Sequence, residues 1–321
     1  MRQYWAAMAI AALSATAFAG NLIPVDDGYT VSQRYLAYKK DFPELELPRL
    51  RFEAGQQILF DRLYKKVGDR ELHADVFLPA LGHANHQAIL LVHGGGWRSG
   101  NKSNFYALAN QLAQRGFVVL TPEFRLSPEA RYPAGLIDIN DAIVWAKANA
   151  AEFGFDGAKL AIGGESSGGQ MAALIAYSAG RDTFKSAPGL DTRVSALIDI
   201  DGLFNFTTPL ALQYENAAGA NSAAGLWLGG AFETVGVKWH EASAAEYVDR
   251  MSPPTLIIAG EAPRFTAGRE QVQDVLDRSH IRNAFIKYDR MPHAFWLFEP
   301  YNSKIAAEID AFLRAPEKTK H

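Results

Sequence analysis

The sequence contains no cysteine among its 321 residues. This excludes disulfide bonds, thiolate metal sites and a catalytic thiol, so any nucleophile must be an oxygen or a nitrogen. Neither sign of charge is in large excess, because 32 Lys and Arg residues stand against 35 Asp and Glu residues, a formal net charge of −3. No run rich in Lys and Arg occurs. A nucleic-acid partner is therefore disfavoured, since such binding needs a basic surface.

The apolar run near the N-terminus is too short to cross a bilayer. It extends from Trp5 to Ala19, which is 15 residues, whereas a spanning helix needs about 20. Arg2 precedes the run, and Ala17-Phe18-Ala19 fits the small-x-small rule for signal cleavage. We therefore expect residues 1–19 to be a signal peptide cleaved after Ala19, and the mature protein to be periplasmic or secreted. A stable membrane anchor is the less favoured alternative.

The rest of the chain shows the pattern of an α/β protein. Residues 20–55 are interpreted as a polar N-terminal arm, and residues 56–321 as one domain. Alternation in Glu71 to Leu78 predicts a strand, paired with Ile58 to Lys65 across a Gly68-Asp69 turn. Six short apolar runs are each typical of a strand buried on both faces. They are Ala88 to Val92, Phe117 to Leu120, Leu160 to Gly163, Val194 to Ile200, Thr255 to Ala259 and Ala284 to Tyr288.

Helical patterns alternate with these runs, for example Phe105, Leu108, Ala109 and Leu112 at positions i, i+3, i+4 and i+7. Alternating strands and helices predict a mostly parallel central sheet flanked by helices. Residues 202–251 lack a strand pattern, and we expect them to form a cap inserted after the sixth strand.

A Gly-x-Ser-x-Gly sequence, residues 164–168, follows one predicted strand and leads into a helical pattern. Glycines two residues before and after a serine allow a cramped strand-to-helix turn that exposes the hydroxyl. Ser166 is therefore the candidate nucleophile. A glycine-rich phosphate-binding turn is the weaker alternative, because no Gly-x-Gly-x-x-Gly or Walker lysine is present.

A second motif, His93-Gly94-Gly95-Gly96-Trp97, follows the run that ends at Val92. Consecutive glycines let backbone amides point into a cavity, as the stabilisation of an oxyanion requires. We expect the amides of Gly95, Gly96 and Ser167 to be the donors and Trp97 to line the substrate site. A plain flexible loop is the alternative.

The general base must come from the same end of the sheet as Ser166. Of the eight histidines, His293 follows the last predicted strand and is the candidate. His93 is expected to brace the glycine loop instead. The other six lie within a strand, in an early loop, in the predicted cap, at the opposite sheet end or at the C-terminus.

In these motifs the chain resembles α/β-hydrolases of the esterase/lipase group, which includes hormone-sensitive-lipase-like carboxylesterases and bacterial acetylxylan or feruloyl esterases. The resemblance covers about Leu72 to Leu313. It depends on four ordered motifs, which are residues 93–97, Phe124-Arg125-Leu126-Ser127-Pro128 with Tyr132-Pro133-Ala134 and Asp138, residues 164–168, and Pro292-His293-Ala294-Phe295. By the same resemblance, Arg125 and Asp138 are expected to be buried polar braces.

The sequence departs from this group at the third triad residue. The resemblance places an aspartate in a Gly-Glu-x-Asp stretch after the seventh strand, but here Gly260-Glu261-Ala262 is followed by Pro263. Three carboxylates qualify by their position at strand ends, and a fourth, Asp199, shares a face with one of them, Asp201. Asp201 ranks first and Glu261 second; Asp289 leaves little chain to fold back, and Asp199 lies deeper.

These residues predict an exported serine esterase that forms an acyl-enzyme, with no metal or cofactor. Its substrate is expected to be a modest acyl ester, small or linked to a polysaccharide, with acetyl or feruloyl groups as examples. Two alternatives stay open: a serine peptidase or formamidase on the same fold, and an inactive binding protein, because the expected aspartate is missing.

Overall fold

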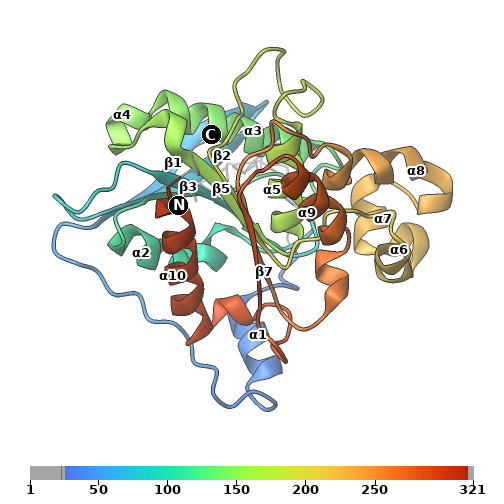
Figure 1. Ribbon diagram of the computed structural model, residues 1–321, viewed down its shortest axis with the longest axis horizontal. Helices are drawn as coiled ribbons and strands as arrows, with labels where there is room; N and C mark the ends of the chain where they lie inside the picture. The colour runs from blue at the N-terminus through green and yellow to red at the C-terminus, as the bar shows by residue number, and fades with distance from the viewer. Residues whose placement is uncertain (1–22, 24–25, 317–321) are drawn as a thin grey trace, which may run out of the picture.

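The computed structural model describes residue 23 and residues 26–316, and its centre is one sheet of eight strands (Figure 1). The strands are β1 (Gln57–Val67), β2 (Arg70–Leu78), β3 (Ala88–Val92), β4 (Val118–Pro122), β5 (Leu160–Glu165), β6 (Leu197–Ile200), β7 (Thr255–Ala259) and β8 (Asn283–Lys287). Their order is β1-β2-β4-β3-β5-β6-β7-β8. The first two pairs are antiparallel and all the others parallel, which confirms the predicted mostly parallel sheet.

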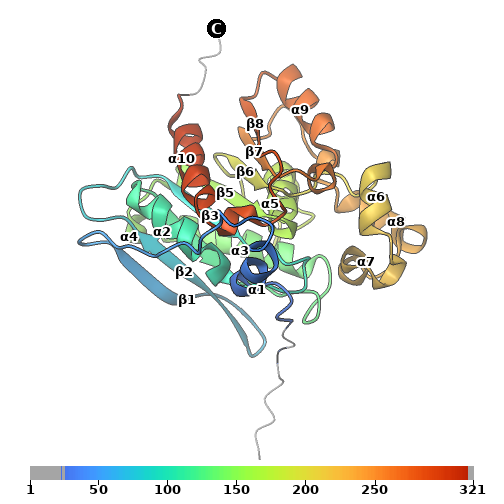
Figure 2. The same cartoon turned by 90° about the horizontal axis from the view of Figure 1, so that it is seen from below.

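Helices cover both faces of this sheet, because its central strands are apolar on both sides. The helices are α1 (Val31–Tyr38), α2 (Tyr106–Gln114), α3 (Ala134–Ala148), α4 (Ala150–Phe153), α5 (Ser167–Ser178), α6 (Pro209–Glu215), α7 (Ala223–Leu228), α8 (Phe232–Glu241), α9 (Arg269–Arg278) and α10 (Tyr301–Arg314). Side chains of α2 and α10 share one buried apolar cluster, and those of α3, α5 and α9 share the other. Figures 1 and 2 show these two layers.

The predicted burial of the strands is correct for the centre of the sheet and wrong for its last strand. Every residue of β3, β4, β5, β6 and β7 is buried. In β8, by contrast, four residues are half-buried and Lys287 is exposed. β8 forms the edge of the sheet and pairs only with β7, so the flanking helices cover it incompletely.

The N-terminal arm is more structured than its polar composition predicts. Thr30 caps α1 by accepting a hydrogen bond from the amide of Gln33. Leu45 is fully buried, and Glu46 forms an isolated β-bridge with Glu299. The arm is therefore attached to the domain at several points, although Leu36 and Phe52 stay exposed. The predicted signal peptide, residues 1–19, lies outside the described residues.

Residues 202–251, the predicted cap, fold into α6, α7 and α8 between β6 and β7. These three helices lie together beside the sheet in both views (Figures 1 and 2). That they act as a cap stays a prediction. Across residues 26–316 no helix is both long and apolar enough to span a bilayer.

Candidate active site

Ser166 lies on a strained turn between β5 and α5. Its φ of 54° falls in the left-handed region, which a non-glycine residue adopts only when the surrounding structure holds it there. A Cβ on Gly164 would come within 2.3 Å of the Gly168 carbonyl oxygen, and one on Gly168 within 2.0 Å of the Val92 oxygen. Both glycines are therefore required for the turn, as the motif predicts.

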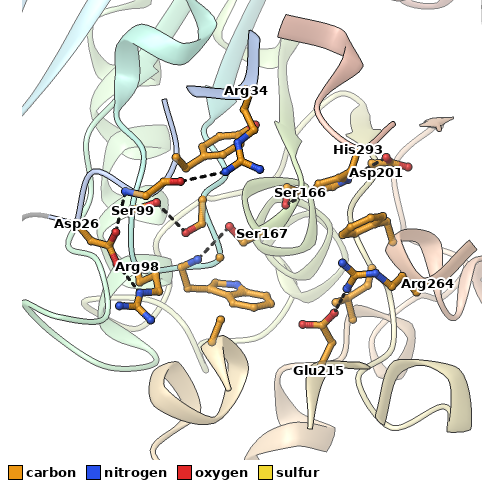
Figure 3. A pocket seen from close by; sticks show the side chains of 18 residues that line it. Asp26, Arg34, Arg98, Ser99, Ser166, Ser167, Asp201, Glu215, Arg264 and His293 are labelled. Carbon is orange, nitrogen blue, oxygen red and sulfur yellow. Dashed lines mark hydrogen bonds and ion pairs between the residues drawn. The ribbon is translucent and has the colours of Figure 1, made fainter. Parts of the chain in front are cut away.

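Three side chains that follow the carboxyl ends of three different strands form a continuous hydrogen-bonded chain. The Oγ of Ser166 is 2.8 Å from Nε2 of His293, and Nδ1 of His293 is 3.0 Å from Oδ2 of Asp201. Asp201 follows β6 directly, is buried, and accepts the amide of Gly260 on its other oxygen at 2.9 Å. Since an ionised carboxylate can only accept, Nδ1 carries the hydrogen and Nε2 is free to accept from Ser166. The structure thus brings the three predicted residues together (Figure 3).

Two aromatic rings that no sequence motif predicted pack against the imidazole of His293. Phe265 stacks on it with ring centroids 3.4 Å apart, and Trp296 meets it edge-on at 4.9 Å. Burial lowers the pKa of His293, the hydrogen bond and charge of Asp201 oppose this, and the charges of Arg264 and Arg34 lower it further. The ring is therefore kept neutral, the state that can accept a proton, to lower pH than an ordinary histidine.

The three residues whose amides are predicted to bind an oxyanion lie at the same cavity as Ser166. Gly95 and Gly96 have φ of 121° and 62°, and Ser167 begins α5. Throughout the described residues, the amides of these three make no hydrogen bond to protein. All three residues line the cavity together with Ser166. The structure therefore offers the predicted donors for an oxyanion, with the N-terminus of α5 adding positive potential.

His93 braces the glycine loop, as expected, and does not reach Ser166. Its Nδ1 lies 2.9 Å from the Gly94 carbonyl oxygen, and its ring stacks on Phe124 with centroids 4.5 Å apart. Burial lowers the pKa of His93 to about 4. It is therefore a neutral, packed side chain at physiological pH.

Glu165, the residue before the nucleophile, joins the glycine loop to the N-terminal arm. One carboxyl oxygen accepts the amide of Gly94 at 2.7 Å, and the other accepts the hydroxyl of Tyr29 at 3.1 Å. Burial raises the pKa of Glu165 to about 7, although both hydrogen bonds oppose the rise. No sequence motif singled out either Glu165 or Tyr29.

This raised pKa makes stability depend on pH. The folded protein holds the Glu165 proton more tightly than the unfolded chain, whose glutamate titrates at about 4.5. The contribution of Glu165 to the free energy of unfolding is therefore fully present below about pH 4.5. It is lost as the pH rises from about 4.5 to 7, by a total on the order of 3 kcal/mol. In Glu165→Gln the amide oxygen can accept from Gly94, and the amide NH2 can donate to the hydroxyl of Tyr29, without the charge. We therefore expect it to stabilise the protein at pH 8 relative to wild type and not at pH 5.

Urea unfolding of the wild type and Glu165→Gln at both pH values measures this difference. The exposed Glu44, changed to glutamine, is the matched control and should show no pH-dependent difference. An equal difference between Glu165→Gln and wild type at pH 5 and pH 8 would contradict the prediction.

The other candidate acids lie away from His293. Glu261 is exposed, bonds to Lys287 at 3.3 Å and accepts the amide of Arg290 at 2.7 Å. Asp289 pairs with the same lysine at 3.0 Å. Asp199 is fully buried under the turn after β6, where burial raises its pKa well above the ordinary range. None of them shares a hydrogen bond with the imidazole in the described structure.

Trp97 lines the cavity, but most of its ring is used elsewhere. Its indole N–H donates to Gln170 at 2.9 Å, and the ring stacks on Trp227 with centroids 5.1 Å apart.

Arg125 and Asp138 form two parallel hydrogen bonds of 2.8 Å, with Asp138 fully buried. This geometry fits the brace that the resemblance implies.

The cavity around Ser166 has a volume of about 600 Å³ and is built partly from segments remote in sequence. Leu203, Glu215 and Ala223 come from the segment between β6 and β7. Asp26, Gly28, Tyr29 and Arg34 come from the N-terminal arm. The contribution of the arm was not predicted from the sequence, although Val31, Tyr35 and Tyr38 after a Thr30 cap form the i, i+4, i+7 pattern of a helix with an apolar face.

A family model places this arrangement among known proteins. The BD-FAE model matches residues 74–270, more than half of the chain. The chain belongs to the BD-FAE family. The match includes the glycine loop, Ser166 and Asp201, and ends before His293. The resemblance to α/β-hydrolase esterases is thereby confirmed.

Similar proteins carry esterase names. This BD-FAE member is 30% identical to Esterase LipC of Mycobacterium tuberculosis over 178 residues, which is 54% of this chain and 43% of LipC. The chain thus spans less than half the length of that relative. Among solved structures, esterase 2 of Thermogutta terrifontis aligns with a TM-score of 0.65 at 21% identity, covering 84% of this chain and 98% of that one. A bifunctional GH43-CE protein of Bacteroides eggerthii aligns at 0.66 and 22%, covering 82% and 38%. Both likenesses establish the α/β-hydrolase fold.

Proposed function

We propose that this protein is a serine hydrolase of carboxylic esters that works through an acyl-enzyme. The observation that carries the proposal is the hydrogen-bonded chain from Ser166 through His293 to Asp201, which opens into a cavity lined by three unpaired amides. An inactive binding protein would not need a strained serine, a neutral, half-buried histidine and free amides at one point. The esterase names of similar proteins support the same activity.

The reaction follows from the geometry. As Ser166 Oγ attacks the ester carbonyl carbon, its proton passes to Nε2 of His293, and the amides of Gly95, Gly96 and Ser167 bind the oxyanion. Collapse of the tetrahedral intermediate breaks the bond to the alcohol oxygen, which takes the proton from Nε2. A water molecule then repeats both steps on the acyl-enzyme and releases the acid.

We propose modest acyl esters as substrates, acetyl or feruloyl esters of plant polysaccharide among them. The cavity volume suits a small acyl group, and the fold is shared with the GH43-CE protein and with a carbohydrate esterase from gut microbiota. Fold likeness supports this choice only as an analogy.

A panel of substrates tests the activity. We expect the purified protein to hydrolyse p-nitrophenyl acetate and butyrate, and to be much slower on an aminoacyl p-nitroanilide and on N-formylkynurenine. Faster turnover of the anilide would indicate a peptidase, and faster turnover of N-formylkynurenine a formamidase. No turnover of any of the three classes would favour a binding protein.

We also propose that the chain is exported. The short apolar run and the Ala17-Phe18-Ala19 sequence support it. N-terminal sequencing of protein from the native host should begin at Gly20. An intact N-terminus in the membrane fraction would indicate the anchor instead.

A further inference from the structure

The N-terminal arm places a cation in the cavity. Arg34 lies on α1 and lines the cavity with Ser166, and Figure 3 shows its guanidinium extending from the helix toward the part of the cavity that holds the serine. The helix is fixed by contacts to the catalytic elements. Tyr29 donates to Glu165 at 3.1 Å, and the hydroxyl of Tyr38 donates to the backbone carbonyl of His293.

Two other arginines line the same cavity, and each has a carboxylate partner. Nε of Arg98 is 2.5 Å from Asp26, and Nη1 of Arg264 is 3.0 Å from Glu215. Arg264 also lies over the ring of Phe265, 3.8 Å from its centroid. The charges of these two arginines are therefore balanced within the protein.

Arg34 differs from both, because it makes no ion pair with any residue of the described structure. The third carboxylate of the cavity belongs to Asp201, whose two oxygens are occupied by His293 and the amide of Gly260. Its neighbours within the protein are all uncharged at neutral pH: Nη2 donates to the carbonyl of Gly28 at 3.3 Å, the side chain is hydrogen-bonded to Tyr38, and the guanidinium lies 5.8 Å from the centroid of the Tyr29 ring. Nε is enclosed by protein without a partner, so the terminal Nη groups are the donors left for a ligand.

A guanidinium beside a reactive serine suits one kind of ligand group. Arginine binds carboxylates through directed, charge-assisted hydrogen bonds that are about twice as strong as neutral ones. An apolar acyl or alcohol group would gain nothing from this charge. We propose that the cavity selects esters that carry a second, anionic carboxylate group, and that Arg34 binds that group. This inference rests on the proposed esterase function and names its substrate class.

Such an anion would also assist the reaction. His293 becomes an imidazolium during catalysis, and the charge of Arg34 is one of the influences that disfavour this cation. A substrate carboxylate on Arg34 neutralises that influence while it is bound. The anionic group is therefore expected to raise kcat as well as to lower KM.

Matched esters test the selection on the wild-type enzyme. Mono-p-nitrophenyl adipate is compared with its methyl ester, which has the same acyl chain without the charge; 4-acetoxybenzoate is compared with its methyl ester for a charge on the alcohol side. We expect kcat/KM to favour the anionic member of at least one pair by about tenfold or more, and added salt to reduce the preference. The pair whose anionic member is preferred identifies whether the acyl half or the alcohol half of the substrate carries the anion.

Arg34→Met removes the charge with little change in length, and Arg34→Lys keeps it. We expect Arg34→Met to lower the ratio of anionic to neutral kcat/KM about tenfold, and Arg34→Lys to restore part of it. Lys40→Met makes the same change of charge beside α1, at an exposed residue outside the cavity, and should leave the ratio unchanged. Arg34→Met should also raise the pKa seen in the pH profile of kcat/KM for the neutral ester.

The outcomes separate this inference from the proposed function. Wild-type preference for the neutral member of both pairs overturns it, whether or not any variant folds. An equal loss on both members in Arg34→Met also overturns it, and would assign Arg34 to the reaction itself. If no ester of either kind is hydrolysed and Ser166 does not react with a fluorophosphonate, the proposed esterase function fails instead.

Discussion

Replacing Ser166 with alanine should lower kcat for p-nitrophenyl butyrate about a million-fold, because loss of a triad serine removes the covalent route altogether. The measurement is initial rate, accompanied by labelling with a fluorophosphonate and mass spectrometry of the labelled peptide. The label should be on Ser166 in the wild type and absent from the variant. Residual hydrolysis above the uncatalysed rate would come from binding and the three free amides.

A serine at the end of α5, the helix that follows the Ser166 turn, is the control for this change. Ser178 is buried in α5 and donates to the carbonyl of Leu174, away from the cavity. Ser178→Ala should fold and keep most of the activity, although it deletes the same atom. Label on a different serine of the wild type, or undiminished activity in Ser166→Ala, would show that the strained turn after β5 does not hold the nucleophile.

The residues that could be predicted from the sequence are those whose position follows from local pattern. Ser166 and the glycine loop lie directly after apolar runs, so the rule that parallel strands present their carboxyl ends at one edge was enough to bring them together. The same rule made both Asp201 and Glu261 candidates for the acid, and the structure places Asp201, the one ranked first, beside His293. Six short apolar runs and one alternating hairpin also identified all eight strands, with ends shifted by a few residues.

The residues that were missed depend on contacts between distant parts of the chain. Phe265 stacks on His293 from the stretch in which the family resemblance leads one to expect an acid, and no periodicity marks it. Tyr29 and Arg34 reach the cavity because the arm packs back across the domain, 132 residues or more before Ser166 in sequence. A polar composition indicated exposure, but it could not reveal that Tyr29 is buried and that Tyr35 and Tyr38 are partly buried.

The position of the triad acid, after β6 and not after β7, has a testable consequence. Asp201→Asn should lower kcat about ten-thousand-fold, the loss seen when a triad aspartate no longer holds the histidine in the right tautomer. An asparagine amide can donate to Nδ1, which would move the imidazole hydrogen to Nε2 and remove the acceptor that Ser166 needs. The buried negative charge that stabilises the imidazolium is lost as well.

Glu261→Gln is the matched control for this change, because it neutralises the carboxylate that follows β7, where the resemblance would place the acid. Glu261 is exposed and bonds to Lys287 and to the amide of Arg290, with no contact to the imidazole. Its loss should therefore change kcat less than a few-fold.

The hydrogen bond and charge of Asp201 also raise the pKa of His293 against its burial. Any residual activity of Asp201→Asn should therefore persist to lower pH than in the wild type, while Glu261→Gln keeps the wild-type profile. If the two variants exchange these behaviours, the acid acts from β7 and the hydrogen bond between Asp201 and His293 is not used in catalysis.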